Sequence, residues 1–249
     1  MFRPTAKSRT GLLQGSILLI NTGLNMDKSR YWLSGLVMSA MMLNGCASKV
    51  TEVDQYSGYL DRYDVLQPSV SATGASTLRW VSPGFSPAAF DTVNFDGLEL
   101  FPAPTATDRI NMQAFTQLQQ TTNQAVVSAL SKRYRVSNTL QPLPPNARPL
   151  VMRAAITGVN ASNEGMKWYE IIPVAAVVGG VGAVTGHRDQ DTELYVEAVL
   201  LDPATNEPVA RVVRKVFGNK LENASTQIKA EDFTQAINGL GADLSAFVH

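Results

Sequence analysis

Glu193-Leu194-Tyr195-Val196-Glu197-Ala198 is the stretch that decides the fold of this chain, because its side chains alternate with the period of a half-buried β-strand. The turn-rich run Asp202-Pro203-Ala204-Thr205-Asn206-Glu207 follows it, and a second strand pattern occupies Val209–Phe217. Two strand patterns joined by such a run predict a β-hairpin. We expect Glu193 and Glu197 to lie on its solvated polar face.

Two helices and three further strands are predicted around this hairpin. Apolar residues recur every three or four positions in Asn111–Tyr134 and in Glu231–Val248, as they do in amphipathic helices, and Asp108 is expected to cap the first. Strand patterns occur at Asp91–Leu100, Arg135–Leu140 and Leu150–Val159. Because each helix needs a surface to cover, this order predicts a single α+β domain, a mainly antiparallel sheet covered by two amphipathic helices.

Proline and glycine mark where regular structure is expected to stop or to pack closely. Gln67–Ser76 is rich in Pro, Ser, Thr and Gly and is predicted to be a loop. Gly239 and Gly241 fall inside the second helix pattern, where glycine costs about 1 kcal/mol relative to alanine. We therefore expect this helix to pack closely against the sheet at these two positions.

The composition indicates one packed domain and argues against a nucleic-acid partner. The chain has 249 residues with 21 basic and 21 acidic side chains, and the part after residue 45 carries a formal charge of −4. Nucleic-acid binding needs clustered basic residues, and the densest cluster, Lys132-Arg133-Tyr134-Arg135, is typical of the solvated end of a helix. A single cysteine excludes an internal disulfide, so stability must come from packing.

Cys46 is the most informative residue for the location of the protein. It closes the run Leu43-Asn44-Gly45-Cys46 after the apolar stretch Tyr31–Met42, which charged residues precede. A charged region, an apolar core and small residues form a secretory signal, and in bacterial lipoproteins the cysteine that follows closes the lipobox. We expect Cys46 to begin the mature protein, with diacylglycerol on its thiol and a fatty acyl group such as palmitate on its amino terminus.

A buried core cysteine and a transmembrane helix fit this region less well than a lipoprotein signal. A buried core cysteine would not explain the signal-like residues that precede it. A transmembrane helix needs about 20 apolar residues, which is more than the stretch Tyr31–Met42 provides. Met1 lies 45 residues before the cysteine and Met26 lies 20 before it, so Met26 is the expected start of a signal of about 15–30 residues. The predicted organisation is an upstream extension (1–25), a lipoprotein signal peptide (26–45), a tether (46–55) and an α+β domain (56–249).

The uncharged apolar tract Ile171–Gly186 is the other segment with a candidate role. Its glycines have the spacing GxGxxxG, and no βαβ unit surrounds them, which argues against a dinucleotide-binding loop. The tract is also too short to span a membrane. Two interpretations remain, a buried segment packed by its small residues and an apolar loop that contacts lipid or another subunit. The candidate contact residues are Val177, Val178, Gly179, Gly180, Val181 and Gly182.

The sequence contains no recognisable catalytic or metal-binding constellation. Its two histidines, His187 and His249, are too few for a His-based triad or a zinc site. His187 lies near Asp189 and Asp191 in a predicted charged loop, and no GxSxG, P-loop or HExxH motif occurs. We therefore expect a non-enzymatic protein without a metal and without a cofactor, apart from the covalent lipid.

Several short motifs along the chain, considered together, resemble those of a known family. They comprise the lipobox, Tyr56-Ser57-Gly58-Tyr59-Leu60, Leu78-Arg79-Trp80, Ile156-Thr157-Gly158-Val159 and Glu197-Ala198-Val199-Leu200-Leu201-Asp202. The set resembles the Gram-negative lipoprotein family filed as domain of unknown function 3313, over most of residues 46–249. This resemblance implies a lipid-anchored envelope protein and supplies no activity or site.

The sequence thus predicts an outer-membrane lipoprotein that faces the periplasm. Ala47 implies export to the outer membrane by the sorting rule of enterobacterial lipoproteins. The expected partners are the membrane, through the lipid anchor, and an unidentified envelope protein or cell-wall component. The alternative is a subunit of an envelope transport or secretion assembly that uses tract 171–186 for an oligomer or membrane contact.

Overall fold

The computed structural model describes residues 50–162, 190–223 and 225–249, which belong to the compact unit Cys46–His249. Within these ranges no helix is both long and apolar enough to cross a membrane. The helices are α2 (Met112–Leu130) and α3 (Thr234–Val248), and the short 3-10 turns are η2 (Val53–Gln55), η3 (Pro87–Ala89) and η4 (Ala230–Phe233). The predicted upstream extension, the signal peptide and the first four residues of the tether (46–49) lie outside the described residues.

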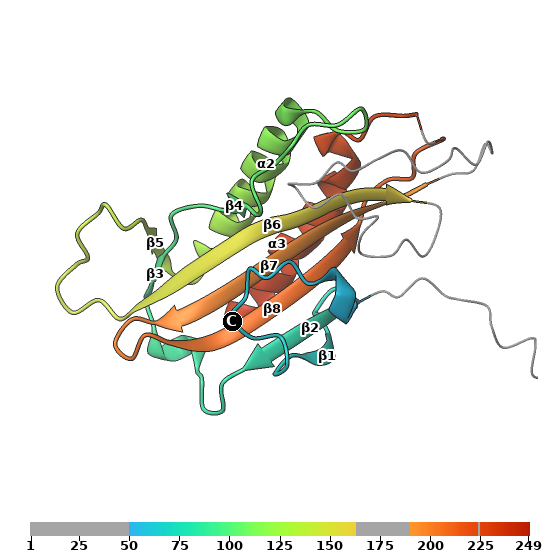
Figure 1. Cartoon of the computed structure of the whole chain (residues 1–249). Helices are drawn as coiled ribbons and strands as arrows, with labels where there is room; N and C mark the ends of the chain where they lie inside the picture. Colours follow the sequence, from blue (N-terminus) through green and yellow to red (C-terminus); the bar gives the residue numbers. More distant parts are fainter. Residues whose placement is uncertain (1–49, 163–189, 224) are drawn as a thin grey trace, which may run out of the picture. The chain divides into compact units, whose positions relative to one another are not determined.

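The described strands form one twisted sheet with α2 and α3 on the same face (Figure 1). The order across it is β1-β2-β8-β7-β6-β3-β5, and β4 pairs with β6. Pairing from β1 to β6 is antiparallel, whereas β3 and β4 run parallel to β6, and β5 runs parallel to β3. The strands are β1 (Gln67–Val70), β2 (Ser76–Val81), β3 (Thr92–Asn94), β4 (Glu99–Leu100), β5 (Arg135–Ser137), β6 (Pro149–Ser162), β7 (Asp191–Asp202) and β8 (Glu207–Phe217). The predicted α+β class is confirmed.

The predicted hairpin is the centre of this sheet. Strands β7 and β8 pair antiparallel from Glu193 opposite Phe217 to Asp202 opposite Glu207, and β6 pairs along the other side of β7. The apolar side chains Leu194, Val196, Ala198 and Leu200 alternate toward the helices and join the main hydrophobic core. Local alternation therefore identified the central strands and the face that the helices cover.

The run Gln67–Ser76 contains a strand, so the predicted loop is wrong there. Residues Gln67–Val70 form β1 and pair with β2 through a tight turn, in which Gly74 has a φ of 83°. Strand β1 lies at the edge of the sheet, where one side of the ladder is unpaired and Pro68 is tolerated without the loss of a central hydrogen bond. The Pro, Ser, Thr and Gly residues of this run are typical of loops, so the sequence pattern did not indicate the short edge strand.

Several predicted element boundaries also change. The expected strand Asp91–Leu100 is divided into β3 and β4. Helix α2 is capped by Asn111, whose side chain accepts a hydrogen bond from the Ala114 N–H at 2.8 Å, and the prediction of Asp108 as the cap is wrong. The local periodicity does not decide which of several nearby polar residues caps a helix or where a strand is interrupted.

The close packing against the sheet expected at the two glycines of α3 is also wrong. A side chain at Gly239 would meet nothing within 4 Å, so no close contact requires a glycine there. A Cβ at Gly241 would lie 3.4 Å from the carbonyl oxygen of Ala125. Residue 125 belongs to α2, so the close approach joins the two helices and not α3 and the sheet.

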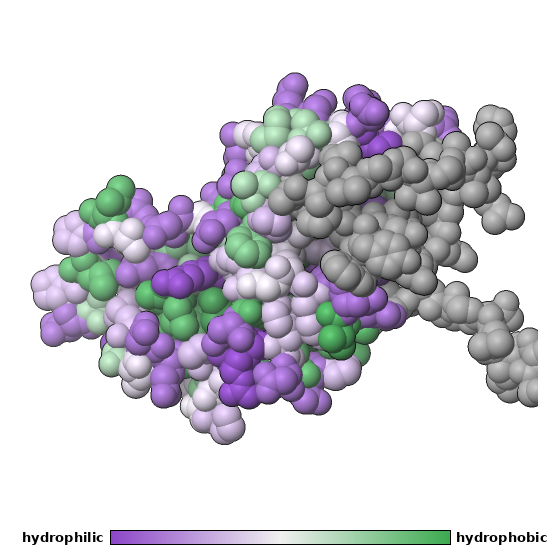
Figure 2. Space-filling model, viewed as in Figure 1, coloured by the Kyte–Doolittle hydropathy of each residue, from purple (hydrophilic) through white to green (hydrophobic). Residues whose placement is uncertain are grey.

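The face of the domain drawn in Figure 2 mixes hydrophilic and hydrophobic residues. Hydrophobic residues gather at the end where the loop between β5 and β6 lies, and in this loop Leu140 is 91% exposed. Scattered exposed apolar side chains are ordinary on protein surfaces. The exposed leucine therefore defines no site.

Candidate functional site

The site residues predicted from the sequence lie outside the part of the chain that the structure describes. These are the lipidation residue Cys46 and the contact residues 177–182, together with His187. Their roles stay predictions. In the described ranges, no group of three or more His, Cys, Asp or Glu side chains is arranged to hold a metal ion.

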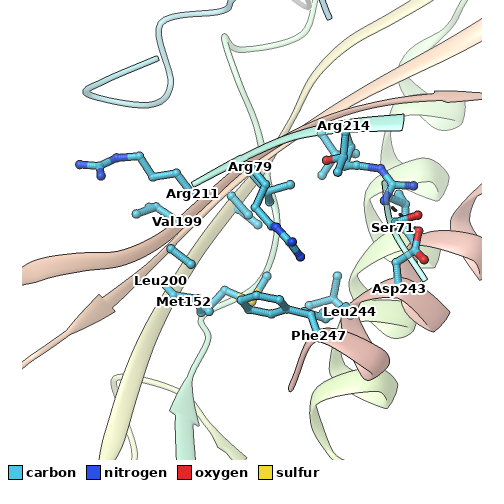
Figure 3. Close-up of a pocket in the computed structure, with 18 of the residues that line it drawn as sticks. Ser71, Arg79, Met152, Val199, Leu200, Arg211, Arg214, Asp243, Leu244 and Phe247 are labelled. Atoms are coloured by element: carbon cyan, nitrogen blue, oxygen red, sulfur yellow. Dashed lines mark hydrogen bonds and ion pairs between the residues drawn. The ribbon is translucent and has the colours of Figure 1, made fainter. Parts of the chain in front are cut away.

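A cavity of about 220 Å³ lies between the sheet and the helices, and it is the candidate site (Figure 3). Its lining comes from β2, β6, β7 and β8 on one side and from α2 and α3 on the other. Most of the lining is apolar, including Met152, Leu200, Val212, Leu240, Leu244 and Phe247. For comparison, an apolar cavity of about 150 Å³ holds a benzene molecule. This space is therefore large enough for a small apolar ligand.

Three alanines on neighbouring strands explain why the space exists. Ala154 of β6 is paired with Ala198 of β7, and Ala210 of β8 lies opposite Leu200. All three alanines line the cavity and belong to the core face of the sheet. Protein interiors are close-packed, so a group of small side chains at the middle of three strands leaves a hollow unless the helices close over it. The register of β6, β7 and β8 thus creates the cavity.

Arg79 brings a positive charge to this apolar space. It is half-buried on β2, opposite Val212 of β8, and Figure 3 shows its side chain pointing into the cavity. Its guanidinium carbon lies 5.8 Å from the centre of the Phe247 ring. Among the residues that the structure describes, Arg79 forms no ion pair and its side chain forms no hydrogen bond. A cation over a ring leaves all five N–H donors of the guanidinium available.

A buried ion pair forms another part of the wall. Arg214 Nη1 lies 2.8 Å from Asp243 Oδ2, and each side chain is 8% exposed. Asp243 also accepts hydrogen bonds from the Thr73 N–H at 2.7 Å and the Thr73 hydroxyl at 3.0 Å. Burial opposes ionisation of Asp243, but its hydrogen bonds and the arginine outweigh this and hold its pKa below the usual value. The charge of Arg214 is thus neutralised locally, whereas that of Arg79 is not.

Two buried polar atoms of the lining residues lack a hydrogen-bond partner among the described residues. They are the hydroxyl of Thr122, on α2, and Nε of Arg214. The Thr122 side chain is completely buried. A buried polar atom without a partner costs about 1–3 kcal/mol. Three further atoms of this kind, in Thr51, Asn94 and Arg109, lie outside the cavity lining, so these two atoms do not by themselves distinguish the cavity.

The opposite face of the sheet corrects the prediction for Glu197. This residue is 1% exposed and not solvated, because the segment around Tyr56–Leu66 lies over it. The Ser57 hydroxyl donates to Glu197 Oε1 at 2.7 Å, and the Tyr63 hydroxyl donates to Oε2 at 2.6 Å. A buried carboxylate needs such donors. The tyrosine-rich segment is therefore the cover of a buried carboxylate.

Glu193 is also buried, at 7% exposure, so the solvated position predicted for it is wrong. Its carboxylate lies 2.9 Å from Lys215 Nζ and accepts a hydrogen bond from the Tyr195 hydroxyl at 2.6 Å. Burial, followed by the neighbouring Glu193 charge and hydrogen bond, raises the pKa of Tyr195. These polar contacts are satisfied within the fold and are a structural feature of the second face.

Sequence reasoning missed the charged residues of the cavity, although one local signal was available. Within β8, Arg214 has the same strand parity as Ala210, Val212 and Val216, which face the core. A charged residue on the apolar face of a central strand requires a buried partner or a function. The partner, Asp243, belongs to α3, which is distant in the sequence. The strand pattern therefore shows that Arg214 is unusual but does not locate the cavity.

Comparisons with known proteins identify the family of this chain. The family described as "Protein of unknown function (DUF3313)" matches residues 55–244. The "Uncharacterized lipoprotein YdcL" of Escherichia coli K12 is 39% identical over 207 residues, which cover 83% of this chain and 91% of the relative.

Two solved structures show a more distant likeness. The PelC dodecamer from Paraburkholderia phytofirmans is 13% identical with a TM-score of 0.33, and the match covers 67% of this chain and 96% of that one. Protein XCC0632 from Xanthomonas campestris is 11% identical with a TM-score of 0.35, and the match covers 73% of this chain and 90% of that one. These likenesses are too distant to support a conclusion about this chain.

Proposed function

We propose that this chain, which belongs to the lipoprotein family of unknown function DUF3313, is a lipid-anchored, non-enzymatic binding protein of the Gram-negative cell envelope. The anchor in this proposal is the lipid on Cys46, and two or more acyl chains are sufficient for stable attachment. Ala47 supports sorting to the outer membrane, with the domain facing the periplasm.

The observation that carries the binding proposal is the cavity between the sheet and α3. Ligand sites are typically concave, mostly apolar and supplied with a few polar groups that orient the ligand. This cavity has that composition, with Arg79 inside an apolar wall. Asp243 is a poor general base, because its hydrogen-bond donors stabilise the carboxylate and lower its pKa. The arrangement therefore favours binding over catalysis.

A thermal-shift experiment with 1-nonanol tests whether the cavity binds an apolar molecule. At a free concentration ten times its Kd, a ligand stabilises the folded state by about 1.4 kcal/mol. For a domain of this size, that raises Tm by about 3–6 °C. We expect this shift for the wild type.

Substitutions in the cavity wall locate the binding. Ala198→Leu adds three carbon atoms at the middle of the cavity and is expected to abolish the shift, whereas Ala198→Val reduces it. Ala204→Leu adds the same atoms in the exposed turn between β7 and β8 and is expected to leave the shift unchanged. No shift in the wild type, or an equal shift in Ala198→Leu, would contradict the proposal.

A further inference from the structure

We propose that the ligand of this cavity is a single-chain carboxylate of about nine carbon atoms, with its carboxylate on Arg79 and its chain against the alanine-lined sheet. This inference rests on the proposed function and adds the charge, orientation and size of the ligand. It follows from the charge at the cavity, the geometry of the guanidinium and the volume of the space.

The charge balance of the cavity favours an anion. Arg214 is paired with Asp243 at 2.8 Å, so that pair contributes no net charge. Arg211, the third arginine of the lining, is paired with Asp61 at 2.9 Å. Arg79 contributes one positive charge, and no carboxylate of the described residues pairs with it. An uncompensated cation beside an apolar space attracts an anion more strongly than the same cation in water, because the surroundings screen the charge less. A neutral ligand would leave the charge of Arg79 without a counter-charge, and a cationic ligand would be repelled by it.

The shape of the guanidinium favours a planar oxyanion. Its N–H donors form a rigid fork that binds both oxygens of a carboxylate. Arg79 is half-buried, and its contact with the Phe247 ring holds the group at the edge of the cavity. A carboxylate bound there keeps its charge near solvent, while the attached chain extends into the apolar interior. The ligand is thus oriented with its head at Arg79.

The volume of the cavity limits the length of the chain. A space of about 150 Å³ accommodates the six carbon atoms of benzene, so about 220 Å³ accommodates about nine by proportion. Burial of each methylene group contributes about fourfold to affinity. We expect affinity to rise about fourfold per methylene from hexanoate to nonanoate and to level off beyond that length.

Isothermal titration with three probes of equal length tests the inference on the purified full chain. The probes are nonanoate, 1-nonanol and nonylammonium, which differ in the charge of the head group. We expect nonanoate to bind at least tenfold more tightly than 1-nonanol, and nonylammonium to bind most weakly. A charge-assisted hydrogen bond supports a difference of this size.

Two substitutions of Arg79 and one matched control complete the experiment. Arg79→Gln is expected to weaken nonanoate binding at least tenfold and to leave 1-nonanol within about twofold, whereas Arg79→Lys retains most of the preference for the anion. Arg153→Gln removes the same charge from the exposed residue Arg153 of β6 and is expected to change neither ligand. Circular dichroism verifies that each variant is folded.

The outcomes separate this inference from the proposed function. Equal binding of nonanoate and 1-nonanol, both abolished by Ala198→Leu, would refute the anionic ligand while the binding cavity stands. The same holds if Arg79→Gln leaves nonanoate binding intact. Failure of every probe to bind the wild type would refute both.

Discussion

Tyr63→Phe tests how the tyrosine-rich segment is held on the sheet. The change removes one oxygen atom that makes three hydrogen bonds of 3.1 Å or shorter and a longer contact of 3.5 Å with the Ser57 hydroxyl. The hydroxyl donates to the buried Glu197 carboxylate at 2.6 Å and accepts the backbone N–H groups of Gly58 at 3.0 Å and Leu60 at 3.1 Å. A hydrogen bond to a charged group contributes about 1.5–3 kcal/mol. With one part-buried amide also losing its acceptor, we expect a loss of about 2–4 kcal/mol.

Urea denaturation at pH 7 measures this loss, and Tyr59→Phe is its matched control. That variant deletes the same atom from a neighbouring tyrosine whose hydrogen bond to Glu99 is exposed and 3.4 Å long. We expect the control to change the free energy of unfolding by less than about 1 kcal/mol. In a domain of this size the main variant should lower Tm by roughly 4–16 °C. Equal losses in the two variants, or a loss below about 1 kcal/mol in Tyr63→Phe, would refute the reasoning.

The same variant has a pH signature. Burial, followed by the hydrogen bond to Glu197, raises the pKa of Tyr63 from 10.0 to about 12. The folded state therefore holds this proton more tightly than the unfolded state does. Its contribution to stability is complete below pH 10 and is lost as the pH rises from about 10 to about 12. The difference in stability between wild type and Tyr63→Phe should shrink over that window, and a constant difference would contradict the assigned cause.

Three further experiments, with five variants, test other parts of the protein. Gly218→Ala places a Cβ 2.5 Å from a backbone oxygen and a hydroxyl and should cost at least about 2 kcal/mol in urea denaturation, whereas Gly239→Ala, with open space in helix α3, should gain about 0.5–1 kcal/mol. The opposite order would be inconsistent with the packing. Asp243→Asn leaves the 8%-exposed Arg214 without its counter-charge and should lower the free energy of unfolding by about 3–5 kcal/mol. The double variant Arg214→Met/Asp243→Leu should lose less stability, because it leaves no buried charge. A larger loss in the double variant would argue against the ion pair. Cys46→Ala should move the protein out of the membrane fraction and remove the lipid from its intact mass, and an unmodified wild type that retains residues 1–45 would disprove the anchor.

The candidate site was less predictable than the sheet. Alternation along β7 and β8 marks which residues face the helices, because strand periodicity is a local property. The cavity depends on Ala154, Ala198 and Ala210 meeting across three strands, which the register decides. The three alanines are far apart in the chain and lie on different strands, so no local pattern of the sequence indicates that they form one hollow.

By itself, the sequence determined the class of the fold, the central hairpin, the two amphipathic helices and the membership of a lipoprotein family, because each depends on residues close together in the chain. Only the tertiary structure decided that Glu197 is buried, since its cover comes from residues about 140 positions earlier. It likewise decided that Arg214 has a counter-charge and Arg79 has none within the described residues. Burial and charge pairing depend on which distant surfaces meet, and local periodicity carries no information about that meeting.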